Sequence, residues 1–259
     1  MMTARFRLIR SRQAVWSRRL SLFTIPLLLL AALLSRNGYI DPPVVLTVIS
    51  FAVVLAALAV GLAISAFVSI WRFGHLGFRK ALLGFIVGAL VLVIPGYVIT
   101  TVVDKPALND VSTDLQNPPA FIAAARVRKA DENPVAYNPA NAAIQQQAYP
   151  GIEPVELKLS AEEVYRLVLE KVVAERWQVL DERQPVNAIE GRVEAVAPSL
   201  IFGFRDDVVI TVDALGEEAS VVNMRSASRY GRHDLGRNAD RIYDFLGELI
   251  ETASPMETR

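Results

Sequence analysis

The sequence predicts a multi-pass α-helical membrane anchor followed by an α+β outer domain. Three observations indicate this fold class. Long apolar runs gather in residues 1–103, which carry ten Lys and Arg and one acidic residue. Residues 104–259 carry seventeen Lys and Arg and twenty-six acidic residues, so a neutral chain has two halves of opposite charge. From residue 155 onward, apolar residues recur at strand and helix spacing.

Two uncharged runs, Pro42–Ser69 and Ala81–Val103, are long enough to cross a bilayer as helices. Leu20–Ser35 has only 16 apolar or small polar residues between arginines, and it spans only if the flanking arginines reach the two interfaces. We therefore expect a basic cytoplasmic leader over 1–19 and a transmembrane region over 20–103, with spans at about 20–36, 43–70 and 81–103. A signal peptide is the alternative for the first span, since "SRRLSLF" is similar to a twin-arginine signal. No A-x-A cleavage site follows, which favours a retained helix.

The charges beside the spans predict the orientation, because loops rich in Lys and Arg stay in the cytoplasm. The short loop after the second run holds Arg72, Arg79 and Lys80, whereas the flank after residue 103 opens with acidic residues. The leader adds six arginines: Arg5, Arg7, Arg10, Arg12, Arg18 and Arg19. We therefore expect a protein of the bacterial inner membrane with its C-terminal domain in the periplasm, whether there are two spans or three.

We interpret the spans as an anchor rather than a transport pathway, because neither long run contains a charged residue. Small residues recur at helical spacing in Ala57, Gly61 and Ser65, and again in Gly84 and Gly88. Such spacing allows close helix packing. A dimer seam is one interpretation. The favoured one is packing between neighbouring helices of the same chain, or chance in spans that are rich in Ala and Gly.

Residues 104–154 form a Pro-rich arm with seven of the fourteen prolines. Proline at this density opposes regular structure, apart from a short helix near Phe121–Lys129. Phe121, Tyr137 and Tyr149 are expected to anchor the arm against the domain.

An α+β domain is predicted over 155–252, with a tail over 253–259. A strand "VELKL" precedes a helix that opens with a capping box, Ser160 and Glu163. Further strands follow around Trp177, around Ile189–Ala195 and in a hairpin closed by "LGEE"; a C-terminal helix repeats apolar residues from Leu235 to Leu249. The order is β-α-β-β-β-β-α, which predicts an antiparallel sheet with two helices packed on one face. This order is similar to helix-grip and TATA-binding-protein-like architectures. In "IFGF", we expect Phe202 and Phe204 to share a strand face and pack in the core rather than line a groove.

The segment Arg225–Asn238 concentrates the candidate site residues. Strand alternation predicts that Arg225 and Arg229 project from the face opposite Val222 and Met224. Asp234 is expected to cap a helix that starts at Leu235. Arg225, Arg229 and Arg232 are candidates for binding an anion. The favoured alternative is an ion-pair ladder in which Asp206, Asp207 and Asp213 neutralise these arginines.

Catalysis receives weaker support. His233 and Asp234 are neighbours that rarely face one another, and the serines of the segment lack a nucleophile elbow. No cysteine is present, and no spacing typical of metal ligands occurs, so we predict neither a metal nor a cofactor. His75 is expected at the cytoplasmic membrane interface. The negative charge of the second half disfavours nucleic acid.

Two motifs carry a family resemblance: "NDVSTDLQNPPAF", and "FRDDVVI" followed by "RSASRYGRHDLGRNADRI". The chain resembles the domain of unknown function 1499 family over about residues 108–251, in its membrane-anchored bacterial form. The resemblance implies no activity. It places the following residues on the family's signatures: Asp114, Asn117, Pro118, Pro119, Phe121, Asp207, Arg225, Ser226, Ser228, Arg229, Gly231, Asp234, Gly236, Asn238 and Arg241.

Two functions are therefore considered. The favoured one is a periplasmic binding or envelope-assembly module whose partners are the bilayer and a lipid-like ligand, a peptide ligand or an envelope protein. The alternative is a periplasmic hydrolase or transferase that uses the Arg/His/Asp cluster.

Overall fold

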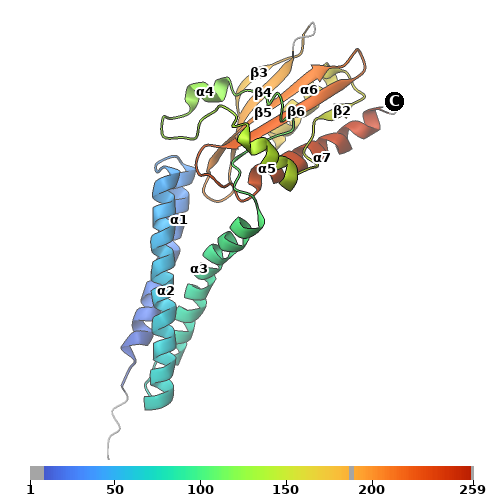
Figure 1. The fold of residues 1–259 in the computed structure, drawn as a ribbon. Helices are drawn as coiled ribbons and strands as arrows, with labels where there is room; N and C mark the ends of the chain where they lie inside the picture. The colour runs from blue at the N-terminus through green and yellow to red at the C-terminus, as the bar shows by residue number, and fades with distance from the viewer. Residues whose placement is uncertain (1–8, 187–189, 258–259) are drawn as a thin grey trace, which may run out of the picture. The chain divides into compact units, whose positions relative to one another are not determined.

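The computed structural model describes residues 9–186 and 190–257, and its elements are drawn in Figure 1. Arg5 and Arg7 of the predicted leader, Ile189 of a predicted strand and the end of the predicted tail lie outside the described residues. The chain divides into two compact units. The first comprises residues 1–100 with 201–203, and the second comprises residues 101–200 with 204–259.

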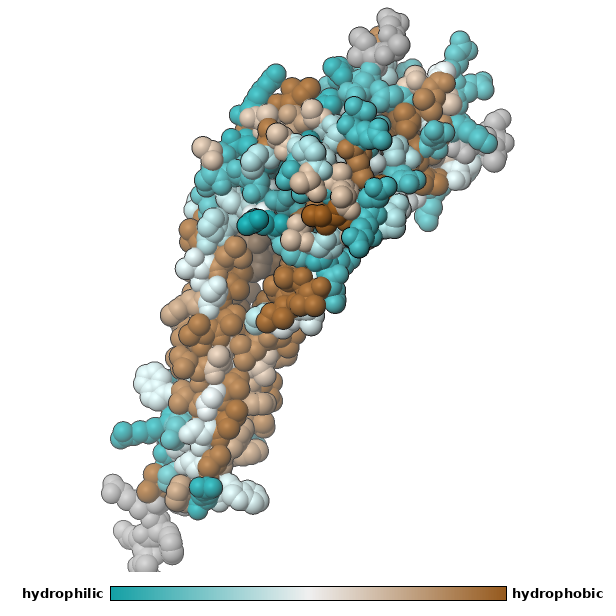
Figure 2. Space-filling view, viewed as in Figure 1, coloured by the Kyte–Doolittle hydropathy of each residue, from teal (hydrophilic) through white to brown (hydrophobic). Residues whose placement is uncertain are grey.

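The first unit is built from three helices, α1 (Arg12–Arg36), α2 (Pro42–Phe73) and α3 (Phe78–Asp104). Each is long and apolar enough to cross a membrane. Their surface is mostly brown, that is hydrophobic, in Figure 2. The first helix is longer than the predicted span because Ser11 caps it, accepting a hydrogen bond from the Ala14 amide.

Glycines bring these helices together. A Cβ on Gly84 would lie 2.1 Å from Ser17 Oγ of α1, and one on Gly88 would lie 2.9 Å from Val60 Cγ2 of α2. The prediction of packing within the chain is therefore confirmed for this pair. Ala57, Gly61 and Ser65 do not take part in such packing, since they are exposed. A neighbouring stripe of α2 is buried instead: Ala52, Ala56, Ala59, Ala63 and Ala66.

The second unit contains a six-stranded antiparallel sheet in the order β1-β6-β5-β4-β3, with β2 also pairing with β6. The bounds of the strands are β1 Asp110–Ser112, β2 Val155–Leu157, β3 Gln178–Arg183, β4 Gly191–Pro198, β5 Arg205–Ala214 and β6 Ser220–Ser228. The helices are α4 Ala123–Val127, α5 Ala140–Ala148, α6 Ala161–Ala174 and α7 Arg237–Glu257. From β2 onward the predicted β-α-β-β-β-β-α order is confirmed.

The main core lies between one face of the sheet and the two long helices α6 and α7. The predicted capping box starts α6, since Ser160 Oγ accepts from the Glu163 amide and Glu163 accepts from the Ser160 amide. Trp177 stacks on Phe245 of α7, with 5.3 Å between the ring centroids. Val193, Ile210 and Met224 supply the sheet side of this core.

Residues 105–154, the rest of the predicted arm, cover the opposite face of the sheet through Phe121 and Ala124, which pack on Val209 and Ala227. Figure 1 shows α6 partly hidden behind the strands and α5 in front of them. Two regular elements of the arm, β1 and α5, are not predicted from the sequence.

Two further expectations are wrong. Phe202 and Phe204 lie in the loop between β4 and β5 rather than on a strand, since Gly203 turns the chain there with φ +65°. Leu235 does not start the last helix, because Leu235 and Gly236 have φ values of +62° and +84°, and α7 begins at Arg237.

Candidate functional site

Buried charged side chains gather on the sheet face that the arm covers. Arg225 of β6 is 2% exposed and donates to Asp110 of β1 through two bonds, Nε to Oδ1 at 2.9 Å and Nη2 to Oδ2 at 2.7 Å. It also donates to the carbonyls of Pro119 and Val135. Its guanidinium carbon lies 4.6 Å from the centroid of the Phe121 ring. Arg225 therefore joins the sheet to both ends of a long arm segment.

Asp207 of β5 is the second centre of this layer. Arg229 Nη2 lies 2.7 Å from Asp207 Oδ1, and Arg128 Nε from the arm lies 2.6 Å from Oδ2. Arg128 also donates to the carbonyls of Asn133 and Pro134. The three side chains are almost fully buried. A buried carboxylate between two guanidinium groups makes charge-assisted hydrogen bonds to both, and these bonds fix the arm on the strand.

The expected pairing of the arginines with β5 aspartates is correct for Arg229 and Asp207. Asp206 points to the other face, where it pairs with Arg237 at 3.0 Å and Arg241 at 2.7 Å. Among the described residues, Asp213 has no ion pair with these arginines. Burial raises the pKa of Asp213, and Glu190 adds to that rise. The partner of Arg225, Asp110, comes from a strand that the sequence does not predict.

Glu194 of β4 holds the start of α4. Its side chain is fully buried and accepts from the amides of Ile122 at 2.8 Å, Ala123 at 2.9 Å and Ala124 at 3.0 Å. Arg192, two residues earlier on the same strand face, lies 3.1 Å from it. A carboxylate at a helix start satisfies amides that have no partner within the helix. Neither charged residue is predicted as a site residue from the sequence, although the alternation of both with Val193 and Ala195 could have indicated a charged face.

The second half of the Arg225–Asn238 segment is bonded to the chain that follows α3. Asp234 donates its amide to the Leu108 carbonyl at 2.9 Å, and Asn238 Nδ2 reaches the Asn109 carbonyl at 3.2 Å. His233 Nε2 lies 3.1 Å from the Lys105 carbonyl. Residues 105–109 are therefore held in place by the Asp234 amide and by the side chains of His233 and Asn238.

These bonds assign a role to each predicted catalytic candidate. His233 Nδ1 accepts from the Leu235 amide at 2.9 Å, so a neutral ring that carries its proton on Nε2 satisfies both nitrogens. The Asp234 carboxylate accepts from the amides of Gly236 and Asn238, each at 2.8 Å. Burial raises the pKa of Asp234, and these two backbone bonds oppose that rise. Asp234 thus caps α7 from three residues before its first residue.

The other signature residues also have internal partners. Ser226 donates to Asn238 Oδ1 at 2.7 Å, and Asn238 Nδ2 donates to Ser228 Oγ at 3.0 Å. Asp114 accepts from the Gln116 and Asn117 amides in the turn that leads into Pro118 and Pro119. The structure therefore brings the two signatures together across β1 and β6.

Arg232 differs from the other two arginines proposed to bind an anion. Arg225 and Arg229 are buried in ion pairs, whereas Arg232 is exposed and has no ion pair with any residue in the described part of the chain. It lies at a cleft of about 280 Å³, here named the arm cleft. The lining comprises Ala107, Asn109, Asp110, Asn133, Pro134, Ala136, Asn138, Asn141, Ala227, Ser228 and Arg232. Four asparagines and one arginine make this a surface for polar groups rather than for hydrocarbon.

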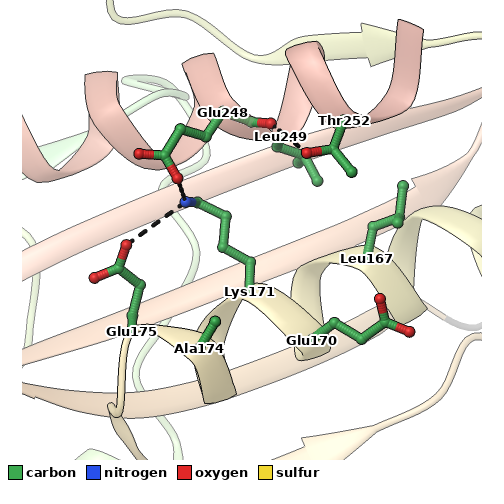
Figure 3. A pocket seen from close by; sticks show the side chains of 8 residues that line it. All are labelled: Leu167, Glu170, Lys171, Ala174, Glu175, Glu248, Leu249 and Thr252. Carbon is green, nitrogen blue, oxygen red and sulfur yellow. Dashed lines mark hydrogen bonds and ion pairs between the residues drawn. The ribbon is translucent and has the colours of Figure 1, made fainter. Parts of the chain in front are cut away.

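A second cleft of about 380 Å³ lies between α6 and α7 (Figure 3). Lys171 points across it toward Glu248 and pairs with Glu248 and with Glu175. Its ammonium group also lies 5.1 Å from the centroid of the Phe245 ring. The only cation in this lining is therefore already neutralised by two carboxylates. Within residues 9–186 and 190–257, no group of three potential metal ligands occurs.

The comparison with protein families agrees with this geometry. A family model described as "Protein of unknown function (DUF1499)" matches residues 110–249, from the first residue of β1 into α7. The match includes β1, the arm from residue 110 onward and the Arg225–Asn238 segment. No curated protein matches the chain.

Proposed function

From the premise that the chain belongs to the DUF1499 family, we propose that it is a membrane-anchored binding module, with a domain outside the cytoplasm that holds a polar, anionic group of an envelope component. The anchor is the set of helices α1–α3, and the binding surface is the arm cleft. The proposal depends most on Arg232, the exposed arginine at a cleft rich in asparagine.

The charge distribution supports the side of the membrane. Arg72 lies in the last turn of α2 and Arg79 and Lys80 in the first turn of α3, and the chain beyond α3 is acidic overall. Cationic loops remain in the cytoplasm, so α3 is expected to run outward. In a bacterium with two membranes, the second unit is then periplasmic.

The chemistry of the arm cleft supports the ligand class. The neighbouring arginines, Arg225 and Arg229, have carboxylate partners, which leaves the Arg232 guanidinium to contribute positive charge. Guanidinium groups bind phosphate and carboxylate through paired hydrogen bonds. The asparagine side chains can add neutral hydrogen bonds around the same group. A volume of about 280 Å³ accommodates a headgroup or a short peptide end.

No specific observation favours the hydrolase or transferase alternative. Both ring nitrogens of His233 and both oxygens of Asp234 have backbone partners. Neither residue is among those that line the arm cleft. If a deletion phenotype exists, His233→Asn should still complement it; loss of complementation by a folded His233→Asn variant would restore the enzyme hypothesis.

The binding proposal is tested by native mass spectrometry of the full chain extracted from its own membranes. We expect an adduct on the wild type that is lost in Arg232→Ala. Arg126→Ala, which removes an exposed arginine on α4, is the matched control and should keep the adduct. Equal adduct on all three proteins, or none on the wild type, contradicts the proposal.

The orientation is tested separately with C-terminal fusions. An alkaline phosphatase fusion should be active and a cytoplasmic-type fluorescent protein fusion should be dark. The opposite pattern places the domain in the cytoplasm.

A further inference from the structure

The loop between β4 and β5 exposes large apolar side chains. Leu200 is 86% exposed and Ile201 is 64% exposed. The loop is closed by its own bonds, since the Ser199 amide donates to the Phe204 carbonyl at 2.8 Å and the Phe204 amide donates to Ser199 Oγ at 2.9 Å. Exposure of two large apolar side chains to water is unfavourable, because the hydrophobic effect favours removal of apolar surface from water.

This loop begins and ends at the edge of the sheet where the chain arrives from α3. Pro198 pairs with Arg205 as the last register of the β4–β5 hairpin. The Arg205 carbonyl accepts from the Arg229 amide, and the preceding residue, Ser228, donates its amide to the Asn109 carbonyl. Asn109 follows Asp104, the last residue of α3, by five positions. Five residues span at most about 18 Å, so this edge stays near the end of α3.

The composition of the loop fits a lipid surface rather than water. Residues 199–204 contain no acidic residue, and the exposed Arg205 follows them. The β5–β6 hairpin, at the other end of the same strands, exposes Leu215 beside Glu217 and Glu218. Apolar side chains with a neighbouring arginine suit the acyl and phosphate layers of a bilayer, whereas paired glutamates do not.

We propose that the β4–β5 loop inserts Leu200 and Ile201 into the interface of the same bilayer that α3 spans, with Arg205 at the level of the lipid phosphates. This inference rests on the proposed membrane anchor. It gives the chain a contact with the membrane beyond the helices α1–α3, and it commits the exposed side chains of Leu200 and of Ile201, which is grouped with the first unit, to lipid.

The test uses the absence of cysteine from the natural sequence. Single variants Leu200→Cys and Ile201→Cys of the full chain receive a nitroxide label in liposomes of phosphatidylethanolamine and phosphatidylglycerol. Collision rates with oxygen, which enters bilayers, are compared with those of a nickel chelate, which stays in water. Leu215→Cys is the matched aqueous control, because Leu215 is an exposed leucine in a hairpin at the opposite end of the sheet. Leu90→Cys, an exposed position within α3, is the bilayer control.

We expect oxygen-to-nickel collision ratios at Leu200→Cys and Ile201→Cys several-fold higher than at Leu215→Cys and approaching that of Leu90→Cys. A high ratio at Leu90→Cys with loop ratios equal to that of Leu215→Cys overturns this inference and leaves the anchor intact. Shielding of the loop labels from both reagents also overturns it, because the loop is then covered by protein. A low ratio at Leu90→Cys overturns the anchor and the inference together.

Discussion

A substitution at Asp234 tests directly whether the Arg225–Asn238 segment has a structural role. Asp234→Ala removes the acceptor for the Gly236 and Asn238 amides, and both of these residues are buried. A buried amide without a partner costs about 1 to 3 kcal/mol. Removal of a carboxylate whose pKa burial has raised offsets part of this cost. The net loss of unfolding free energy is expected to be about 2 kcal/mol, at the upper end for a lost helix cap.

The assay follows the fluorescence of Trp177 during thermal unfolding of the full chain in detergent. Trp177 stacks on Phe245 of α7, so its signal reports the helix that Asp234 caps. The background carries Trp16→Phe and Trp71→Phe. A loss of about 2 kcal/mol lowers the midpoint by roughly 4 to 8 °C for a domain of this size. Asp234→Asn keeps one acceptor and should lower it by less than half as much. An unchanged midpoint in Asp234→Ala, or an equal fall in both variants, refutes the cap assignment.

Three further outcomes are expected. Glu194→Gln should lower the unfolding free energy in urea by about 2 to 4 kcal/mol, because a buried carboxylate that serves three amides is replaced by one oxygen; equal urea midpoints would show that these bonds add nothing. Gly88→Leu should lower the temperature at which far-UV ellipticity is lost, since a Cβ there meets α2, whereas Gly96→Leu meets nothing within 4 Å and should not. Tyr149→Phe should leave stability at pH 7 unchanged or slightly higher, because within the described residues its buried hydroxyl has no hydrogen-bond partner. Burial and then Asp234 raise the pKa of Tyr149 to about 12, so the wild type loses stability as pH rises from 10 to 12, by at most about 2 kcal/mol from this group. Urea titrations over this range should show a smaller loss for Tyr149→Phe; some loss remains, because burial also raises the pKa values of Tyr137 and Tyr165.

The long-range partners mark the limit of what could be predicted from the sequence. Local patterns predict the three apolar helices, the capping box of α6 and the alternation that turns Arg225 and Arg229 away from the core. They do not predict Asp110 as the partner of Arg225, because the two residues are 115 positions apart and β1 has only three residues. A strand of three residues is too short to show the alternation of apolar and polar residues. It forms because β6 has an edge with which it can pair.

The same limit applies to the arm and the β4–β5 loop. Proline content correctly disfavours long regular elements, yet α5 forms between Pro139 and Pro150. The Gln145 side chain exchanges hydrogen bonds with the Ser112 backbone, which fixes this helix on β1. Phe202 and Phe204 have strand spacing, but Gly203 between them allows a left-handed turn that no alternation rule detects.

The hydrogen bonds of Glu194 determine which substitutions the arm tolerates. Its three acceptor bonds go to main-chain amides, which every residue other than proline supplies. Exposed Ile122 can therefore be exchanged freely by mutation without any matching change on β4, while replacement of the acid itself affects all three bonds at once. Variation should therefore be one-sided: Glu194 stays fixed while Ile122 changes, with no correlated change between the two positions.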